Sequence, residues 1–82
     1  MKKKLYNVVI SQNQEDEFKI CEIKTFTSIK KAENYLKESF KDDINCAKDD
    51  GLSIEGCYCT FNEAYNPAYQ SYFHIIESEV EL

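Results

Sequence analysis

The apolar residues in the middle of this 82-residue chain recur at helical spacing, and they constrain the fold more than any other feature. They lie three, four, four, four and three positions apart: Ile29, Ala32, Leu36, Phe40, Ile44 and Ala47. This spacing places them in one stripe on an amphipathic helix of about five turns, with lysines and acidic residues on the opposite face. Thr27 or Ser28 is the expected N-cap, and Gly51 the expected stop. The stripe needs an apolar surface to pack against, which the flanking segments must supply.

The segments on both sides of the helix have the residue types and the alternation of β-strands. We expect two strands before the helix and two after it, at residues 6–10, 18–26, 52–61 and 71–82. The polar stretch 11–17 and the proline-containing stretch 62–70 are expected to be loops. The predicted fold is therefore α+β, in the order ββαββ, with one amphipathic helix packed on a four-stranded, mostly antiparallel sheet. A chain of this size is expected to form a single domain, residues 1–82.

Two of these strands indicate which side chains share a face. In 18–26 the alternation is broken, because Phe18 and Ile20 have one parity while Cys21 and Ile23 have the other. A β-bulge or burial on both sides would explain this break. In 71–82 the alternation is regular, and it places His74 on the face expected to point inward.

Charge is distributed very unevenly along the chain. Residues 1–41 hold nine lysines against six acidic residues, a formal +3, whereas residues 42–82 hold one lysine against nine acidic residues, a formal −8. The net charge of −5 and the absence of arginine disfavour general binding to nucleic acid or to anionic membranes. The apolar run that follows the N-terminal lysines is too short for a signal peptide, so a cytoplasmic location is expected.

Residues that often carry chemistry do not form a recognisable catalytic or metal-binding motif. Cys57 and Cys59 are spaced more closely than the usual paired zinc ligands, so we expect reduced thiols that act as small buried hydrophobic residues. His74 has no nucleophile motif around it and is expected to be a packing residue. With Gly51 and Gly56 as the only glycines, a glycine-rich phosphate loop is excluded. The sequence therefore predicts a protein that is not an enzyme and uses no cofactor and no metal.

Exposed aromatic and acidic residues are the better candidates for a binding site. Tyr65 and Tyr69 flank Pro67 and are expected to be exposed, although these rings would alternatively complete a small core. Three glutamates, Glu77, Glu79 and Glu81, share one strand face at roughly the spacing of nucleic-acid phosphates, although they would alternatively form only a charged, solvated face. The predicted partner-binding set is Tyr65, Tyr69, Glu77, Glu79, Glu81, Asp49 and Asp50.

A short, acidic, arginine-free ββαββ chain that ends in Tyr-Phe-His-Ile-Ile-Glu-Ser-Glu-Val-Glu-Leu, residues 72–82, resembles small proteins of phages and mobile elements in low-GC Gram-positive bacteria. Anti-CRISPR and other anti-defence inhibitors belong to this group, and several act as acidic mimics of nucleic acid. The resemblance implies an inhibitor in the host cytoplasm whose acidic second half blocks a basic nucleic-acid-binding groove on a host protein, such as a CRISPR effector. It implies no direct contact with nucleic acid or membrane, and it carries no residue roles.

The alternative from another class is a structural or regulatory interaction module without nucleic-acid mimicry. Such a module would self-associate, as a homodimer, through an exposed sheet edge or through the tyrosine-containing loop. The two hypotheses are compatible if an inhibitor is dimeric.

Overall fold

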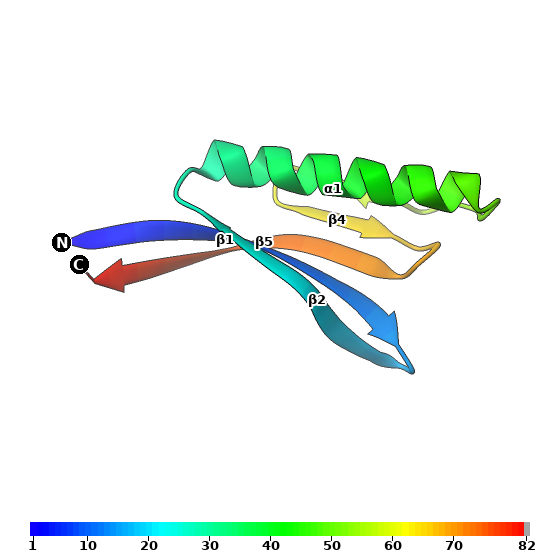
Figure 1. Cartoon of the computed structure of the whole chain (residues 1–82), viewed down its shortest axis with the longest axis horizontal. Coiled ribbons are helices and arrows are strands. Elements are labelled where there is room, and N and C mark those ends of the chain that lie inside the picture. Colours follow the sequence, from blue (N-terminus) through cyan, green and yellow to red (C-terminus); the bar gives the residue numbers. More distant parts are fainter. Residues whose placement is uncertain (82) are drawn as a thin grey trace.

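The computed structural model describes residues 1–81 and shows one helix lying across one face of an antiparallel sheet (Figure 1). The sheet has five strands in the order β2-β1-β5-β4-β3. Along the chain the elements are β1 (Lys2–Gln14), β2 (Glu17–Phe26), α1 (Ile29–Asp49), β3 (Tyr58–Cys59), β4 (Glu63–Asn66) and β5 (Ser71–Glu81). The predicted α+β class is thus confirmed, with one strand more than expected.

Helix α1 begins and ends at the residues that the sequence indicates. The Ser28 hydroxyl accepts a hydrogen bond from the backbone N–H of Lys31 at 3.4 Å, as an N-cap does. After the helix, Gly51 adopts φ +75°, a conformation that favours glycine, and the next N–H, of Leu52, reaches the carbonyl of Ala47 at 2.9 Å. The amphipathic stripe is therefore held at both ends.

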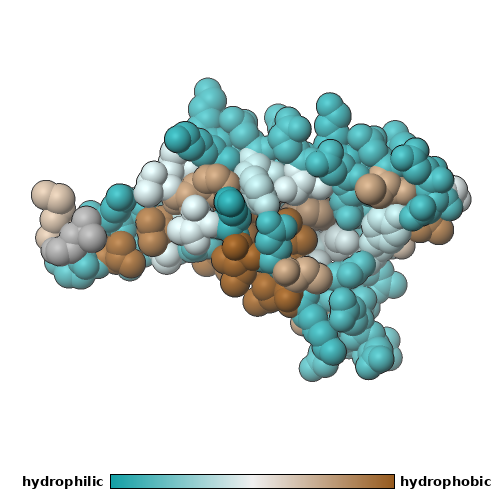
Figure 2. Space-filling model, viewed as in Figure 1, coloured by the Kyte–Doolittle hydropathy of each residue, from teal (hydrophilic) through white to brown (hydrophobic). Residues whose placement is uncertain are grey.

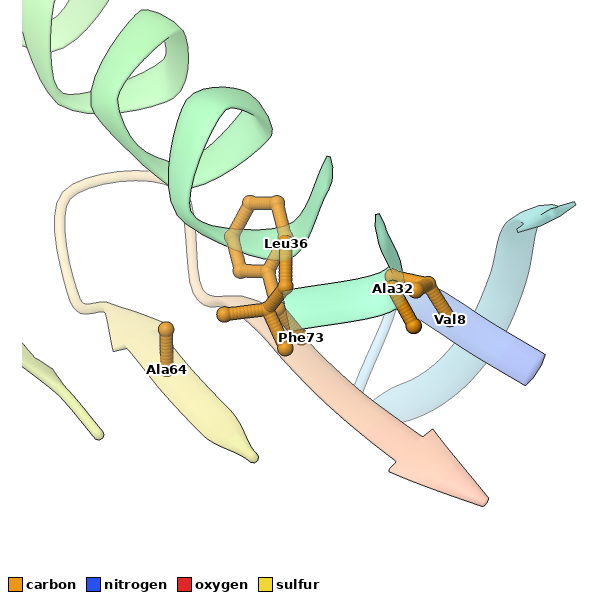
Figure 3. Packing of buried hydrophobic residues seen from close by; sticks show 5 residues of the cluster. All are labelled: Val8, Ala32, Leu36, Ala64 and Phe73. Atoms are coloured by element: carbon orange, nitrogen blue, oxygen red, sulfur yellow. The ribbon is translucent and has the colours of Figure 1, made fainter. Parts of the chain in front are cut away.

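The core is a thin layer between α1 and the central strands. Its fully or almost fully buried members are Val8, Ala32, Leu36, Ala64 and Phe73 (Figure 3). Leu36 is the largest of the completely buried side chains, and the ring of Phe40 meets that of Phe73 edge-on at 5.8 Å. The middle of the predicted stripe therefore joins the helix to the sheet.

The broken alternation in β2 marks a β-bulge. Opposite β1, Glu22 pairs with Ile10 and Ile20 pairs with Ser11, so that Cys21 is the extra residue. Because the bulge shifts the parity, Ile20 and Ile23 lie on the same face of the sheet.

Two predicted loops contain strand instead. The polar stretch 11–17 continues β1 as far as Gln14, and the reversal is a two-residue turn in which Glu15 and Asp16 both have positive φ. Ser11 is buried here, Gln12 and Asn13 are half-buried, and the amides of Gln12 and Asn13 donate hydrogen bonds to Tyr69 and Gln70. Because this end of the strand is built from polar residues, it gives no apolar alternation to read.

The strand predicted at 52–61 is wrong for most of its length, because this segment is irregular except for Tyr58–Cys59. The fourth strand, Glu63–Asn66, lies inside the stretch expected to be a turn. Here the buried amide of Asn66 donates to Asp43 at 2.7 Å and its side-chain oxygen accepts from the N–H of Ala68 at 3.0 Å. These polar contacts, which have no periodic signature, anchor β4 under the helix.

The covered face of β5 is also the opposite of the one expected. Phe73 and Ile75 point toward α1, whereas His74 shares the uncovered face with Tyr72 and Ile76. The last predicted strand residue, Leu82, lies outside the described residues. Within residues 1–81, no helix has both the length and the apolar character needed to cross a bilayer.

Candidate protein-interaction surface

The sheet face that α1 leaves uncovered carries a group of exposed apolar side chains. We call it the helix-free face, and its large apolar members are Phe18, Ile20, Ile23, Ile76 and Val80, which are 57%, 63%, 56%, 48% and 39% exposed. The three most exposed belong to β2. Figure 2 shows apolar atoms gathered on the side away from the helix, where β1, β2 and β5 cross. One helix covers one side of this sheet, so apolar residues on the other side remain in water.

A shallow hollow of about 370 Å³ lies in the middle of the helix-free face. Side chains from β1, β2 and β5 line it: Asn7, Val9, Ser11, Ile20, Ile23, His74 and Ile76. The bulge at Cys21 contributes directly to this lining, because it brings Ile20 and Ile23 to the same side. The hollow is apolar at its walls, a composition suited to another apolar surface and not to a charged substrate.

His74 is the one titratable residue lining this hollow. Burial lowers the pKa of its imidazole below the usual value, and the carboxylate of Glu63 opposes that effect only partly. The ring lies 4.9 Å from that of Tyr72, centroid to centroid, and Nδ1 is buried with no hydrogen-bond partner in the described chain. Within residues 1–81, no hydrogen bond joins the His74 ring to an acid or a nucleophile.

Two of the predicted binding residues meet at the C-terminal end of α1. The hydroxyl of Tyr69 donates a hydrogen bond to a carboxylate oxygen of Asp50, and this bond, with some burial, raises the pKa of Tyr69 to about 12. Asp49 is exposed next to them. The contact links the turn after β4 to the end of the helix through the Tyr69 hydroxyl. Tyr69 and Tyr65 are both half-buried, so the expectation that they are exposed is wrong.

Tyr65 lies elsewhere, on the helix-free face. It pairs across the strands with Tyr58 and with Tyr72, and its ring centroid is 6.2 Å from that of Tyr58. The two tyrosines that flank Pro67 in sequence therefore do not form one binding patch. The two rings are separated because Tyr65 belongs to strand β4, whereas Tyr69 lies in the turn that follows this strand.

The three glutamates of β5 form a ladder of ion pairs with the N-terminal end of β1. Glu77 lies 3.1 Å from the ammonium of Lys4, Glu79 lies 3.9 Å from that of Lys2, and Glu81 lies 3.3 Å from the N-terminal amine. All six groups are half or more exposed. The carboxylates thus keep contact with water, but each of them has a positive charge of the N-terminal segment beside it.

The cysteines are not the buried hydrophobic residues that the sequence analysis expected. Cys21, Cys46 and Cys59 are exposed and Cys57 is half-buried, so that prediction is wrong. Cys21 is exposed because it is the bulge residue of an edge strand, and the other three lie on the outer side of α1 or around β3. Nowhere in residues 1–81 do three His, Cys, Asp or Glu side chains gather as metal ligands would.

Comparisons with protein-family models, with curated proteins and with solved structures found no significant match to this chain. The predicted binding residues lie in three separate places, and the exposed apolar side chains of the helix-free face belong to residues outside that set. The broken alternation of β2 is visible in the sequence and indicates that Ile20 and Ile23 can share a face. It does not indicate which face of the sheet the helix leaves uncovered.

Proposed function

We propose that this protein is a non-enzymatic interaction protein that self-associates at the β2 edge of its helix-free face, with a second copy of the same chain as the partner. The observation that carries the proposal is the exposure of Phe18, Ile20 and Ile23 on one edge strand, beside Ile76 and the hollow. Phe18, Ile20 and Ile23 lie close together on one strand, and exposed apolar side chains gathered in this way mark interaction sites.

A second copy is the occupant favoured by the chemistry of the face. Its apolar side chains need an apolar counterpart, and the same surface on another chain supplies one of equal size. The charges of β2 also alternate in sign, which suits pairing with itself. A strongly charged partner would gain little from this face.

Sedimentation velocity across protein concentration tests the proposal. We expect a concentration-dependent dimer that persists at high salt, because apolar burial is not screened. Ile20→Ser should shift the equilibrium toward monomer, whereas Leu52→Ser should not, since Leu52 is an exposed apolar residue in the loop after α1. A protein that remains monomeric at every soluble concentration would overturn the proposal.

As a second candidate we propose the acidic inhibitor that the sequence resembles, with its contact surface at the end of α1. Asp49 and Asp50 are exposed there, Asp50 accepts the hydrogen bond of Tyr69, and no lysine pairs with either carboxylate in the part of the chain that the structure describes. These groups support binding to a basic groove on a host protein better than the lysine-paired glutamates of β5 do. The two candidates are compatible, because the end of α1 is separate from the helix-free face.

The test of the second candidate is a pull-down from a bacterial host, followed by binding measurements at low and high salt. An acidic mimic should bind faster and more tightly at low salt. Neutralising Asp49 and Asp50 to asparagine should weaken binding more than converting Glu77, Glu79 and Glu81 to glutamine. Affinity that does not change with salt would exclude mimicry.

A further inference from the structure

The outer edge of β2 is the longest unpaired edge of the sheet. β2 has ten residues and pairs only with β1, and all of them except Phe26 are exposed. The opposite edge, β3, has two residues. An extended strand with free N–H and C=O groups is a template for another strand. Such a strand adds backbone hydrogen bonds to whatever its side chains contribute.

The charges along β2 are self-complementary. In chain order they are Glu17, Lys19, Glu22 and Lys24. Read from the other end, the order is lysine, glutamate, lysine, glutamate, so that each charge meets its opposite when the strand is laid antiparallel to a copy of itself. Opposite charges directly across an antiparallel pair stabilise it, and like charges destabilise it.

We propose that two copies of this protein join edge to edge, β2 against β2, with Lys24 opposite the partner's Glu17 and Lys19 opposite the partner's Glu22. The two-fold axis then passes between Ile20 and Cys21. Each charge pair occurs twice, and the two sheets become one continuous sheet. This inference rests on the proposed self-association and names the surface that carries it.

The bulge makes this arrangement possible. Residues directly opposite in an antiparallel pair have side chains on the same face, but Lys19 and Glu22 have opposite parity in an unbroken strand. With Cys21 as the extra residue, Lys19 pairs with Gln12 and Glu22 pairs with Ile10, so both point to the helix side. On the helix-free face, Phe18 then comes opposite the partner's Ile23, and these two apolar side chains cover each other.

The neighbouring registers are excluded by charge. A shift by two residues in one direction places Lys19 opposite the partner's Lys24, and a shift in the other direction places Glu17 opposite the partner's Glu22. A shift by one residue would pair each residue of the helix side with a residue of the helix-free face, which an antiparallel pair does not allow. The Tyr35 hydroxyl donates a hydrogen bond to one carboxylate oxygen of Glu22, and the other oxygen remains available for the partner's Lys19. One register therefore satisfies both the charges and the faces.

Lysines and bulges on edge strands also occur as protection against pairing. That explanation requires a monomer, and it gives no reason for charges that complement each other across the bulge. The two explanations differ in their response to charge reversal.

The first experiment exchanges the outer charges. Lys24→Glu places two glutamates opposite each other at both ends of the joint and should weaken dimerisation roughly tenfold. The exchange Glu17→Lys with Lys24→Glu restores opposite charges and should restore the affinity. Lys37→Glu, on the exposed side of α1, makes the same change in net charge and is the matched control. A dimer that responds equally to Lys24→Glu and Lys37→Glu overturns this register.

The second experiment uses Cys21 as a reporter of the axis. In the proposed register the Cα atoms of the two Cys21 residues lie roughly 6 Å apart, within reach of a disulfide. With the other three cysteines changed to serine, mild oxidation should give a covalent dimer, and Cys21→Ser should abolish it. A dimer in sedimentation that fails to cross-link and ignores the charge exchange overturns the edge-to-edge arrangement but leaves self-association standing. A monomer at all concentrations overturns both.

Discussion

His74 shows how one residue can be placed wrongly by a correct pattern. Alternation in 71–82 indicates that His74 and Ile76 share a face, and they do. The pattern cannot say which face the helix covers, because Ile75 and the glutamates that follow it share the other face. That face is buried near Phe73 and open near Glu77, where β5 extends beyond the helix.

The depressed pKa of His74 has a consequence for stability. Burial favours the neutral imidazole in the folded protein, while the unfolded chain has the ordinary pKa near 6.5. The unfolded state therefore binds the proton more readily. The contribution to stability is present above pH 6.5 and is lost as the pH falls through the lower, folded-state pKa.

We expect the free energy of unfolding, measured by urea denaturation, to be smaller at pH 5 than at pH 7. His74→Gln should flatten this difference, since His74 is the only histidine in the chain. A protein that is more stable at pH 5, or a variant with an unchanged slope, would contradict the assignment.

At the scale of elements, strong periodicity was readable and short or polar strands were not. The stripe of α1 spans about five turns, so chance matches are few, and the bulge left its mark as a change of parity. β3 and β4 have two and four residues, too few to establish alternation. Their positions follow from tertiary contacts such as Asn66 with Asp43, which no local pattern encodes.

The helix offers the clearest test of the layer arrangement. Leu36 is completely buried against the sheet, so Leu36→Ala should cost about 2–5 kcal/mol of unfolding free energy. Its neighbour Lys37 is exposed, and Lys37→Ala should cost only a few tenths of a kcal/mol. Thermal melts of the two variants would decide between the faces. Equal losses would mean that the helix packs by a different side.

At the scale of the whole molecule, the chain is elongated, 49 Å by 26 Å by 16 Å, because β1 and β5 continue past the helix (Figure 1). Lys2 and Glu81 pair at the end of this ribbon, which has no helix above it. There the pairing depends on backbone hydrogen bonds and on the ion pairs of Glu77, Glu79 and Glu81. The acidic half of the sequence is therefore divided between this ribbon and the end of α1, and does not form one negative surface.

This division predicts that the glutamate ladder contributes little to global stability. Each of its ion pairs is exposed to water, where such pairs contribute about 0–1 kcal/mol and are screened by salt. Changing Glu77, Glu79 and Glu81 together to glutamine should lower the melting temperature slightly at low salt and less at high salt. The hydrogen exchange of the backbone amides of residues 2–5 should accelerate, because the ribbon end opens locally without the rest of the sheet. A large, salt-independent loss of stability would instead mean that the ribbon end is part of the cooperative core, in spite of its exposure.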